Sequence, residues 1–204
     1  KPIFYENLKE LNKEFFPEFK EKFEDFLNSG WYILGETVKT FEENFSTFNN
    51  SNFTVGLASG LDALHLAINS LNLDKGSEII VPSNTYIATI LAIINNGHIP
   101  VMVEPDIKTY NIDPDLIDAK ITNKTKAIIV VHLYGKSCEM DKICAIANKY
   151  SIPIIEDCAQ AHGSTFKGEN VGNFGNFGAF SFYPTKNLGA LGDAGALTMK
   201  SESE

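Results

Sequence analysis

Two stretches decide the fold of this chain: Ser181-Phe182-Tyr183-Pro184-Thr185-Lys186-Asn187-Leu188-Gly189 and, upstream of it, Pro153-Ile154-Ile155-Glu156-Asp157-Cys158-Ala159-Gln160. The upstream stretch runs from apolar residues into Asp157, as a buried strand does where it ends. The downstream stretch follows an apolar strand and holds Lys186 in a turn bounded by proline and glycine. Because ligands of open α/β sheets bind at the carboxyl ends of the strands, both residues are candidates for a ligand site.

A lysine amine can bond covalently to a cofactor aldehyde. A carboxylate can keep a pyridine nitrogen protonated, so that the ring acts as an electron sink. Each residue alone has an ordinary explanation, as a surface lysine or as an aspartate that caps a turn. The order and spacing of Lys186 and Asp157, with the motifs below, favour pyridoxal phosphate (PLP) chemistry.

The composition is that of an ordinary globular protein, since 44% of the 204 residues are hydrophobic and 21% are charged. The net charge of -9 argues against nonspecific nucleic-acid binding. A phosphorylated small-molecule ligand remains an alternative, because a binding pocket can be positively charged in a protein whose net charge is negative. Three cysteines without a C-x-x-C pair favour a reducing cytoplasm over a disulfide framework or a zinc site.

No apolar stretch approaches the length of a transmembrane helix, so we expect no membrane partner. The N-terminus has no signal-peptide pattern, which also favours a cytoplasmic location. The chain begins at Lys1 rather than at methionine, which indicates a trimmed N-terminus.

The hydrophobic pattern changes near residue 50. Residues 8–28 and 37–49 have apolar side chains at helical spacing, with a break expected before Pro17. From residue 51 short apolar strands alternate with helices, which predicts an α/β sandwich on a mostly parallel mixed sheet. We expect an N-terminal helical segment over 1–50 and a PLP-binding large domain over 51–204. The expected strands are 53–57, 77–81, 99–104, 126–131, 152–156, 177–182 and 194–199, and the expected helices between them are 60–72, 85–95 and 140–150.

A candidate phosphate site follows the first of these strands. Ser59 and Gly60 open a helix, where free amides and the helix dipole favour an anion. A plain serine N-cap with a glycine turn is the alternative. Tyr86, at the start of a later helix, either stacks on a flat cofactor or packs in the core.

Two other patterns predict no ligand. Gly172, Gly175 and Gly178 form G-x-x-G-x-x-G, which opens no helix and is therefore not a dinucleotide fingerprint. The four histidines show no metal spacing, so we expect no metal site. Loop 167–176, rich in glycine and asparagine, is expected to be mobile.

Together the motifs resemble the DegT/DnrJ/EryC1/StrS family of sugar aminotransferases, PLP enzymes of fold type I, the fold of aspartate aminotransferase. The resemblance covers essentially the whole chain in order, through residues 30–35, 58–64, 81–89, 131–135, 156–163 and 181–189. It implies that Lys186 binds PLP covalently and later moves a proton between substrate and cofactor. It also implies that Asp157 pairs with the pyridine nitrogen, Gln160 faces the ring hydroxyl and Tyr86 stacks on the ring. The phosphate is then held by Ser59, Ser181 and the amides of Gly60 and Leu61.

The resemblance implies transfer of the amino group of L-glutamate to a nucleotide-linked keto sugar. The phosphate turn at 60–64 and the runs at 83–89 and 132–135 are most like those of enzymes that convert dTDP-3-keto-6-deoxyhexose to dTDP-3-amino-3,6-dideoxyhexose. A 4-keto or UDP-sugar aminotransferase of the same family stays open, as does a non-catalytic fragment or homologue. A PLP-dependent sugar dehydratase is disfavoured, because such relatives have histidine where Lys186 stands.

Members of this family are much longer than this chain and continue into a small C-terminal domain. They form homodimers whose subunits share each cofactor pocket, and a phosphate contact comes from the partner. The resemblance therefore implies an incomplete large domain. The apolar loop 31–34 is consistent with an interface, and burial on the chain's own core is the alternative.

Overall fold

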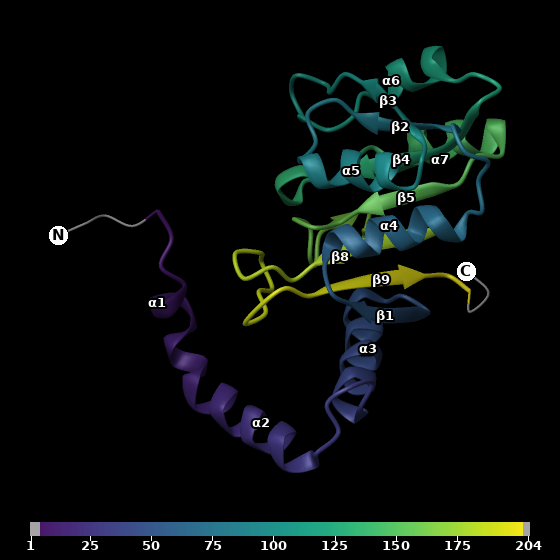
Figure 1. The fold of residues 1–204 in the computed structure, drawn as a ribbon. Helices are drawn as coiled ribbons and strands as arrows, with labels where there is room; N and C mark the ends of the chain where they lie inside the picture. The colour runs from purple at the N-terminus through teal and green to yellow at the C-terminus, as the bar shows by residue number, and fades with distance from the viewer. Residues whose placement is uncertain (1–4, 202–204) are drawn as a thin grey trace.

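A seven-stranded sheet forms the centre of the computed structural model, which describes residues 5–201 (Figure 1). The strand order is β1-β9-β8-β5-β4-β2-β3. Strands β3, β2, β4, β5 and β8 pair in parallel, and β9 lies antiparallel between β8 and β1. The mostly parallel mixed sheet predicted from the sequence is therefore present. Its strands are β1 (Phe53–Leu57), β2 (Glu78–Pro82), β3 (Ile99–Val103), β4 (Thr125–Val131), β5 (Ile154–Asp157), β8 (Phe177–Ser181) and β9 (Gly195–Met199).

Helices cover both faces of the sheet because successive strand residues point to opposite sides. On one face, α4 (Gly60–Ser70) and α5 (Ile87–Asn95) pack with Ile79, Ile129 and Ile155 in one apolar cluster. On the other face, α7 (Met140–Tyr150) and the short α6 (Pro114–Ile117) pack with the alternate strand residues, among them Ile80 and Ile128. The strands are thus apolar on both sides, as parallel strands between helix layers must be.

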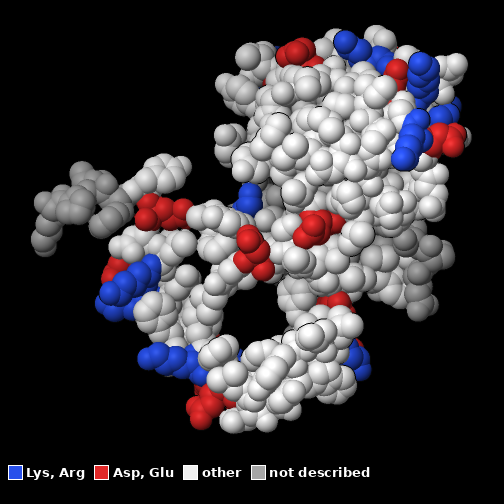
Figure 2. Space-filling model, viewed as in Figure 1, with Lys and Arg blue, Asp and Glu red and all other residues white. Residues whose placement is uncertain are grey.

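The N-terminal segment stands apart from this sandwich. Helices α1 (Leu8–Asn12) and α2 (Phe16–Ser29), joined by the 3-10 turn η1 (Lys13–Phe15), contain no buried residue. They extend away from the sheet as an arm (Figure 1), and a gap separates the arm from the body (Figure 2). Helix α3 (Glu36–Asn49) returns to the body, where Phe45 packs against Phe180 and Phe182.

Most expected elements are present, with ends that differ by up to two residues. The break before Pro17 is confirmed, because Pro17 lies in the first turn of α2 after the 3-10 turn. The sequence pattern missed four short elements and one turn at a strand end. They are α6, η2 (Asp118–Lys120), the β6 (Thr165–Phe166) and β7 (Glu169–Asn170) hairpin, and η3 (Leu133–Gly135).

Loop 167–176 is fixed by hydrogen bonds rather than free, so the expected mobility has no support in its contacts. The amides of Gly172, Phe174 and Gly175 all donate to one buried carboxylate. Within residues 5–201, none of the helices combines the length and the apolarity needed to cross a bilayer.

Candidate active site

The eight residues predicted to bind or act on a cofactor line one cavity of about 580 Å³. They come from the turn between β1 and α4, the start of α5, and the carboxyl ends of β5 and β8. This is the edge of a parallel sheet where ligands bind in α/β proteins. The structure therefore brings together side chains that are up to 127 positions apart, from Ser59 to Lys186. The eight residues are Ser59, Gly60, Leu61, Tyr86, Asp157, Gln160, Ser181 and Lys186.

Asp157 is the last residue of β5, and its side chain points toward α5. Its Oδ2 accepts a hydrogen bond from Thr89 Oγ1 at 2.8 Å, and its Oδ1 accepts one from the amide of Ala159 at 3.1 Å. Burial raises the pKa of the Asp157 carboxyl, and these two hydrogen bonds act in the opposite direction. A cation in the cavity would further favour the ionised form.

Lys186 lies in the turn after β8. Its backbone N–H donates to the carbonyl of Tyr183 at 2.8 Å, which closes the turn. The neighbouring residues Thr185 and Asn187 are exposed, whereas Lys186 is half-buried. The turn thus directs the lysine side chain inward, into the cavity that Asp157 also lines.

The predicted phosphate turn is at the N-terminus of α4. Ser59 is its N-cap: Oγ accepts from the amide of Asp62 at 3.1 Å and donates to the Asp62 carboxylate at 2.9 Å. A Cβ at Gly60 would lie 2.7 Å from Cβ of Ser181, so only glycine lets the helix begin this close to β8. Ser59 therefore does cap the helix, as the alternative predicted. The first amides of the helix also face a corner of the cavity that Ser181 lines.

Gln160 and Tyr86 form another part of the cavity wall. The backbone N–H of Tyr134 donates to Oε1 of Gln160 at 2.9 Å. The other end of that side-chain amide, the Nε2 donor, is thus left for a ligand. Tyr86 is 72% exposed at the N-cap of α5, so the alternative that it packs in the core is wrong.

Positive charge is scarce in this site. All 17 basic residues of the chain are lysines, and Lys186 is the single one that lines the cavity among the described residues. Two carboxylates, Asp157 and Asp193, line the same cavity. Amides and a helix dipole therefore provide most of what the described chain offers a phosphate. The absence of arginine was readable from the sequence.

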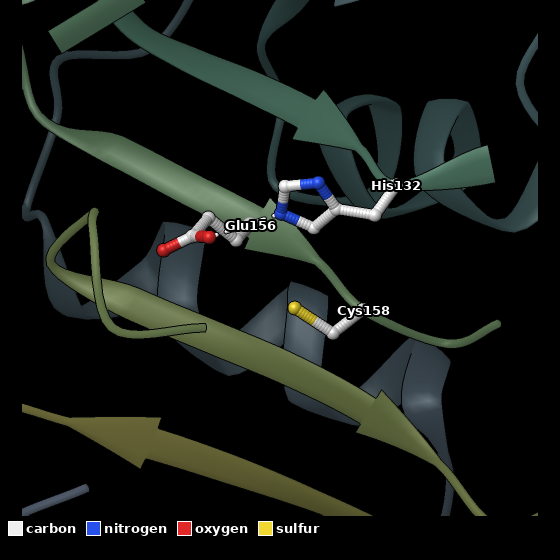
Figure 3. A group of neighbouring side chains, drawn as sticks. All are labelled: His132, Glu156 and Cys158. Atoms are coloured by element: carbon white, nitrogen blue, oxygen red, sulfur yellow. Dashed lines mark hydrogen bonds and ion pairs between the residues drawn. The ribbon is translucent and has the colours of Figure 1, made fainter. Parts of the chain in front are cut away.

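A second polar cluster lies near the site but faces the other side of the sheet. His132, Glu156 and Cys158 are completely buried, and the imidazole points at the carboxylate (Figure 3). Nε2 of His132 and Oε2 of Glu156 are 2.9 Å apart. Glu156 also accepts the amides of Gly172, Phe174 and Gly175. Gly172 has a φ of +86°, which favours glycine.

This cluster has ligand types that metals bind, and its donor atoms lie within 4.8 Å of one another. Hydrogen bonds already occupy the ring nitrogens of His132 and the oxygens of Glu156, however. Nδ1 of His132 accepts the amide of Cys138, and both oxygens of Glu156 accept two hydrogen bonds each. Burial raises the pKa of the Cys158 thiol to about 12, which disfavours the thiolate. The side chains that could bind a metal are therefore part of a hydrogen-bonded network within the protein.

Residues 14–204 match the DegT/DnrJ/EryC1/StrS aminotransferase family. The chain belongs to this family. The match covers nearly the whole chain, so the family predicted from the sequence is confirmed.

Relatives within this aminotransferase family are close in sequence and structure. The dTDP-3-amino-3,6-dideoxy-alpha-D-galactopyranose transaminase of Aneurinibacillus thermoaerophilus is 55% identical over 94% of this chain and 53% of the relative. A crystal structure of S. venezuelae DesV in complex with a ketimine intermediate has a TM-score of 0.94 at 41% identity, over 97% of this chain and 53% of that one. Bacillus subtilis NtdA with bound cofactor PMP has a TM-score of 0.90 at 32% identity, over 100% of this chain and 47% of that one.

These neighbours confirm the predicted fold type I. The chain spans about half the length of the curated relatives it matches. The matched residues 14–204 of this chain contain the sheet, the cavity and the lysine turn described above.

Proposed function

We propose that the full-length protein is a PLP-dependent aminotransferase that moves the amino group of L-glutamate to a nucleotide-linked keto sugar. The observation that carries this proposal is the joint placement of Lys186, Asp157 and the phosphate turn around one cavity. A dTDP-3-keto-6-deoxyhexose is the substrate that we favour. The relative named for a dTDP-3-amino-3,6-dideoxy sugar, 55% identical to this chain, supports that choice.

The residues of the cavity fit PLP by their chemistry. A buried strand-end carboxylate suits a protonated ring nitrogen. The corner beside Gly60, which has no Cβ and is lined by helix amides and Ser181, suits a phosphate. The half-buried amine of Lys186 suits covalent attachment. When bound, PLP supplies an electron sink for the carbon that loses a proton.

Each residue then has a role that its contacts support. Lys186 holds the cofactor and transfers a proton to and from it. Asp157, oriented by Thr89 and Ala159, keeps the ring nitrogen protonated. Gln160 offers its Nε2 donor to the ring hydroxyl, and the exposed ring of Tyr86 stacks on the cofactor. Ser59, Ser181 and the amides of Gly60 and Leu61 hold the phosphate.

Covalent trapping tests this function. In the full-length protein, borohydride should fix added PLP to the peptide that contains Lys186, and Lys186→Arg should abolish this labelling. Labelling at another lysine would remove the basis of the proposal. Incubation with glutamate and either dTDP-3-keto or dTDP-4-keto sugars, followed by mass spectrometry, should show an amino product from the 3-keto sugar.

The working unit that we propose is a cytoplasmic homodimer whose subunits share each site. The apolar side chains of loop 31–34 are 55–80% exposed, which contradicts the alternative of burial on the chain's own core. The scarcity of positive charge in the cavity also supports a contribution from outside this chain. All three cysteines are free thiols, which supports a reducing compartment.

The same proposal assigns residues 1–50 to a helical segment and residues 51–204 to an incomplete cofactor domain. Sedimentation of the full-length protein should show a dimer, and residues 1–204 alone should bind PLP more weakly than the full-length protein. A fully active full-length monomer would exclude the shared site.

A further inference from the structure

Strand β5 ends with two carboxylates at consecutive positions that face opposite sides of the sheet. Asp157 faces the cavity, where Thr89 of α5 binds it. Glu156 faces the other side and is completely buried, at 0% exposure. A buried carboxylate is costly unless hydrogen bonds satisfy it, so the partners of Glu156 determine where this end of β5 can lie.

Glu156 accepts four hydrogen bonds, two at each oxygen. Oε1 accepts the amides of Phe174 at 2.8 Å and Gly175 at 2.7 Å. Oε2 accepts the amide of Gly172 at 2.8 Å and Nε2 of His132 at 2.9 Å. All four partners are donors, which is the arrangement that an ionised carboxylate requires. The loop before β8 is thereby attached to β5.

His132 contacts both acidic residues at the end of β5, Glu156 through its side chain and Asp157 through its main chain. Its Nδ1 accepts the amide of Cys138 at 3.1 Å, so the ring proton is on Nε2 and is directed at Glu156. Its own backbone N–H donates to the carbonyl of Asp157 at 3.1 Å. One residue directly after β4 therefore holds the side chain of Glu156 and the main chain of Asp157.

The network sits where three parallel strands reach the cavity. Asp157 pairs with Val131 of β4 on one side and with Ala179 of β8 on the other. The loop bound by Glu156 leads into β8, which ends at Ser181 beside the phosphate corner. A displacement of Glu156 would therefore move the strand end that carries Asp157 relative to the end that carries Ser181.

We propose that Glu156 and His132 are a positioning pair for Asp157. They fix the end of β5 between β4 and β8, and so determine the position of the Asp157 carboxylate in the cavity. Neither residue lines the cavity, so the pair acts through the strand. This inference rests on the proposed function, because it concerns the contact of Asp157 with the ring nitrogen of PLP.

Glu156→Gln tests the pair with almost no change in shape. Whichever way the new amide turns, its NH2 group faces two donors, either those of Phe174 and Gly175 or those of Gly172 and His132. The matched control is Thr198→Val. Thr198 is also completely buried and holds the same loop, since its Oγ1 donates to the carbonyl of Gly172 at 3.0 Å. It does so from β9, which pairs with β1 and β8 but not with β5, and its Oγ1 also donates to the carbonyl of Gly178 in β8 at 3.3 Å.

The readout is the protonation of the ring nitrogen, measured by NMR on full-length protein loaded with 15N-labelled PLP. We expect a protonated nitrogen in the unsubstituted protein and in Thr198→Val, and a loss of that proton in Glu156→Gln. In Glu156→Gln kcat should also fall by about tenfold or more, while KM for glutamate stays nearly constant. Urea unfolding gives the stability of each variant separately. If Glu156→Gln does not accumulate, His132→Gln is measured instead, because it leaves the three amide bonds to Glu156.

Two results would overturn the positioning role. One is a Glu156→Gln protein that is destabilised like Thr198→Val but keeps the ring proton and normal turnover. The other is loss of the ring proton in both variants, which would show that any loosening of the loop suffices. An unsubstituted protein that binds no PLP, or binds it with an unprotonated nitrogen, would instead overturn the proposed function itself.

Discussion

Replacing Thr89 by valine should remove one hydrogen bond from Asp157 and leave the side-chain shape nearly unchanged. Thr89 is completely buried on α5, and its Oγ1 donates to Oδ2 of Asp157 at 2.8 Å. A hydrogen bond to a charged group contributes about 1.5–3 kcal/mol. We therefore expect Thr89→Val to lower the free energy of unfolding of the cofactor-free, full-length protein by about that amount at neutral pH.

The loss should depend on pH in a defined direction. Burial raises the pKa of Asp157 in the folded protein, and the Thr89 hydrogen bond opposes that rise. Because the folded carboxyl keeps its proton where the unfolded one has lost it, stability falls as pH rises between the two pKa values. Without the Thr89 hydrogen bond the pKa of Asp157 in the folded protein is higher still, so the pH range over which stability falls extends to higher pH. The difference between variant and unsubstituted protein should open as pH rises.

Urea unfolding from the usual aspartate pKa of 3.8 up to neutral pH measures this difference. The matched control is Thr85→Val, which removes the 2.8 Å contact between Thr85 Oγ1 and Thr89 Oγ1 but leaves the bond to Asp157. It should cost about 0.5–1.5 kcal/mol with no pH dependence of this kind. A Thr89→Val loss that is constant with pH, or no larger than that of Thr85→Val, would refute the reasoning.

Two further substitutions test residues of the site and its surroundings. Asp157→Asn should fold and bind PLP, because its amide can still accept from Ala159 and donate to Thr89. Its steady-state turnover should fall by more than about tenfold, or about 1.4 kcal/mol of barrier, and near-normal turnover would contradict the electron-sink role. Burial lowers the pKa of His162 from 6.5 to about 4, so the folded protein loses stability as pH falls through that range. Urea unfolding at pH 6.5 and at about pH 4 gives the drop in the free energy of unfolding between the two values, and this drop should be smaller in His162→Phe than in the unsubstituted protein. Equal drops in the two proteins would show that His162 is not the cause.

Local patterns in the sequence predicted most of the sheet and the residues of the cavity. Continuous apolar runs bounded by glycine, proline and asparagine predict buried parallel strands, and all seven expected strands are present. The strand around Ile155 extends one residue further than expected, through Asp157, because pairing with Ala179 continues it. Strand order in the sheet was not predictable, since periodicity says which face a residue takes but not which strand lies beside it.

The supporting contacts of the site were less accessible from sequence. Thr89 ends the matching run 81–89, but that run does not say what its hydroxyl binds. Thr89 meets Asp157 only because α5 packs on that face of the sheet. Glu156 and His132 are 24 positions apart and meet through the register of β4 and β5. The glycines at 172 and 175 stood out by their spacing, but that spacing does not say which carboxylate they would surround.

The antiparallel position of β9 between β1 and β8 has a consequence for synthesis of the chain. The single sheet partner of β1 within residues 5–201 is β9, and Leu57 pairs with Gly195. At about 5–20 residues per second, a ribosome needs roughly 7–30 s to make the intervening chain. During that interval β1 leaves the exit tunnel with both edges unsatisfied, next to the apolar side chains of α3. We therefore expect a chaperone to bind the nascent chain during this interval. If two chains on adjacent ribosomes pair too early, we expect the pairing to begin at the exposed edges of β1.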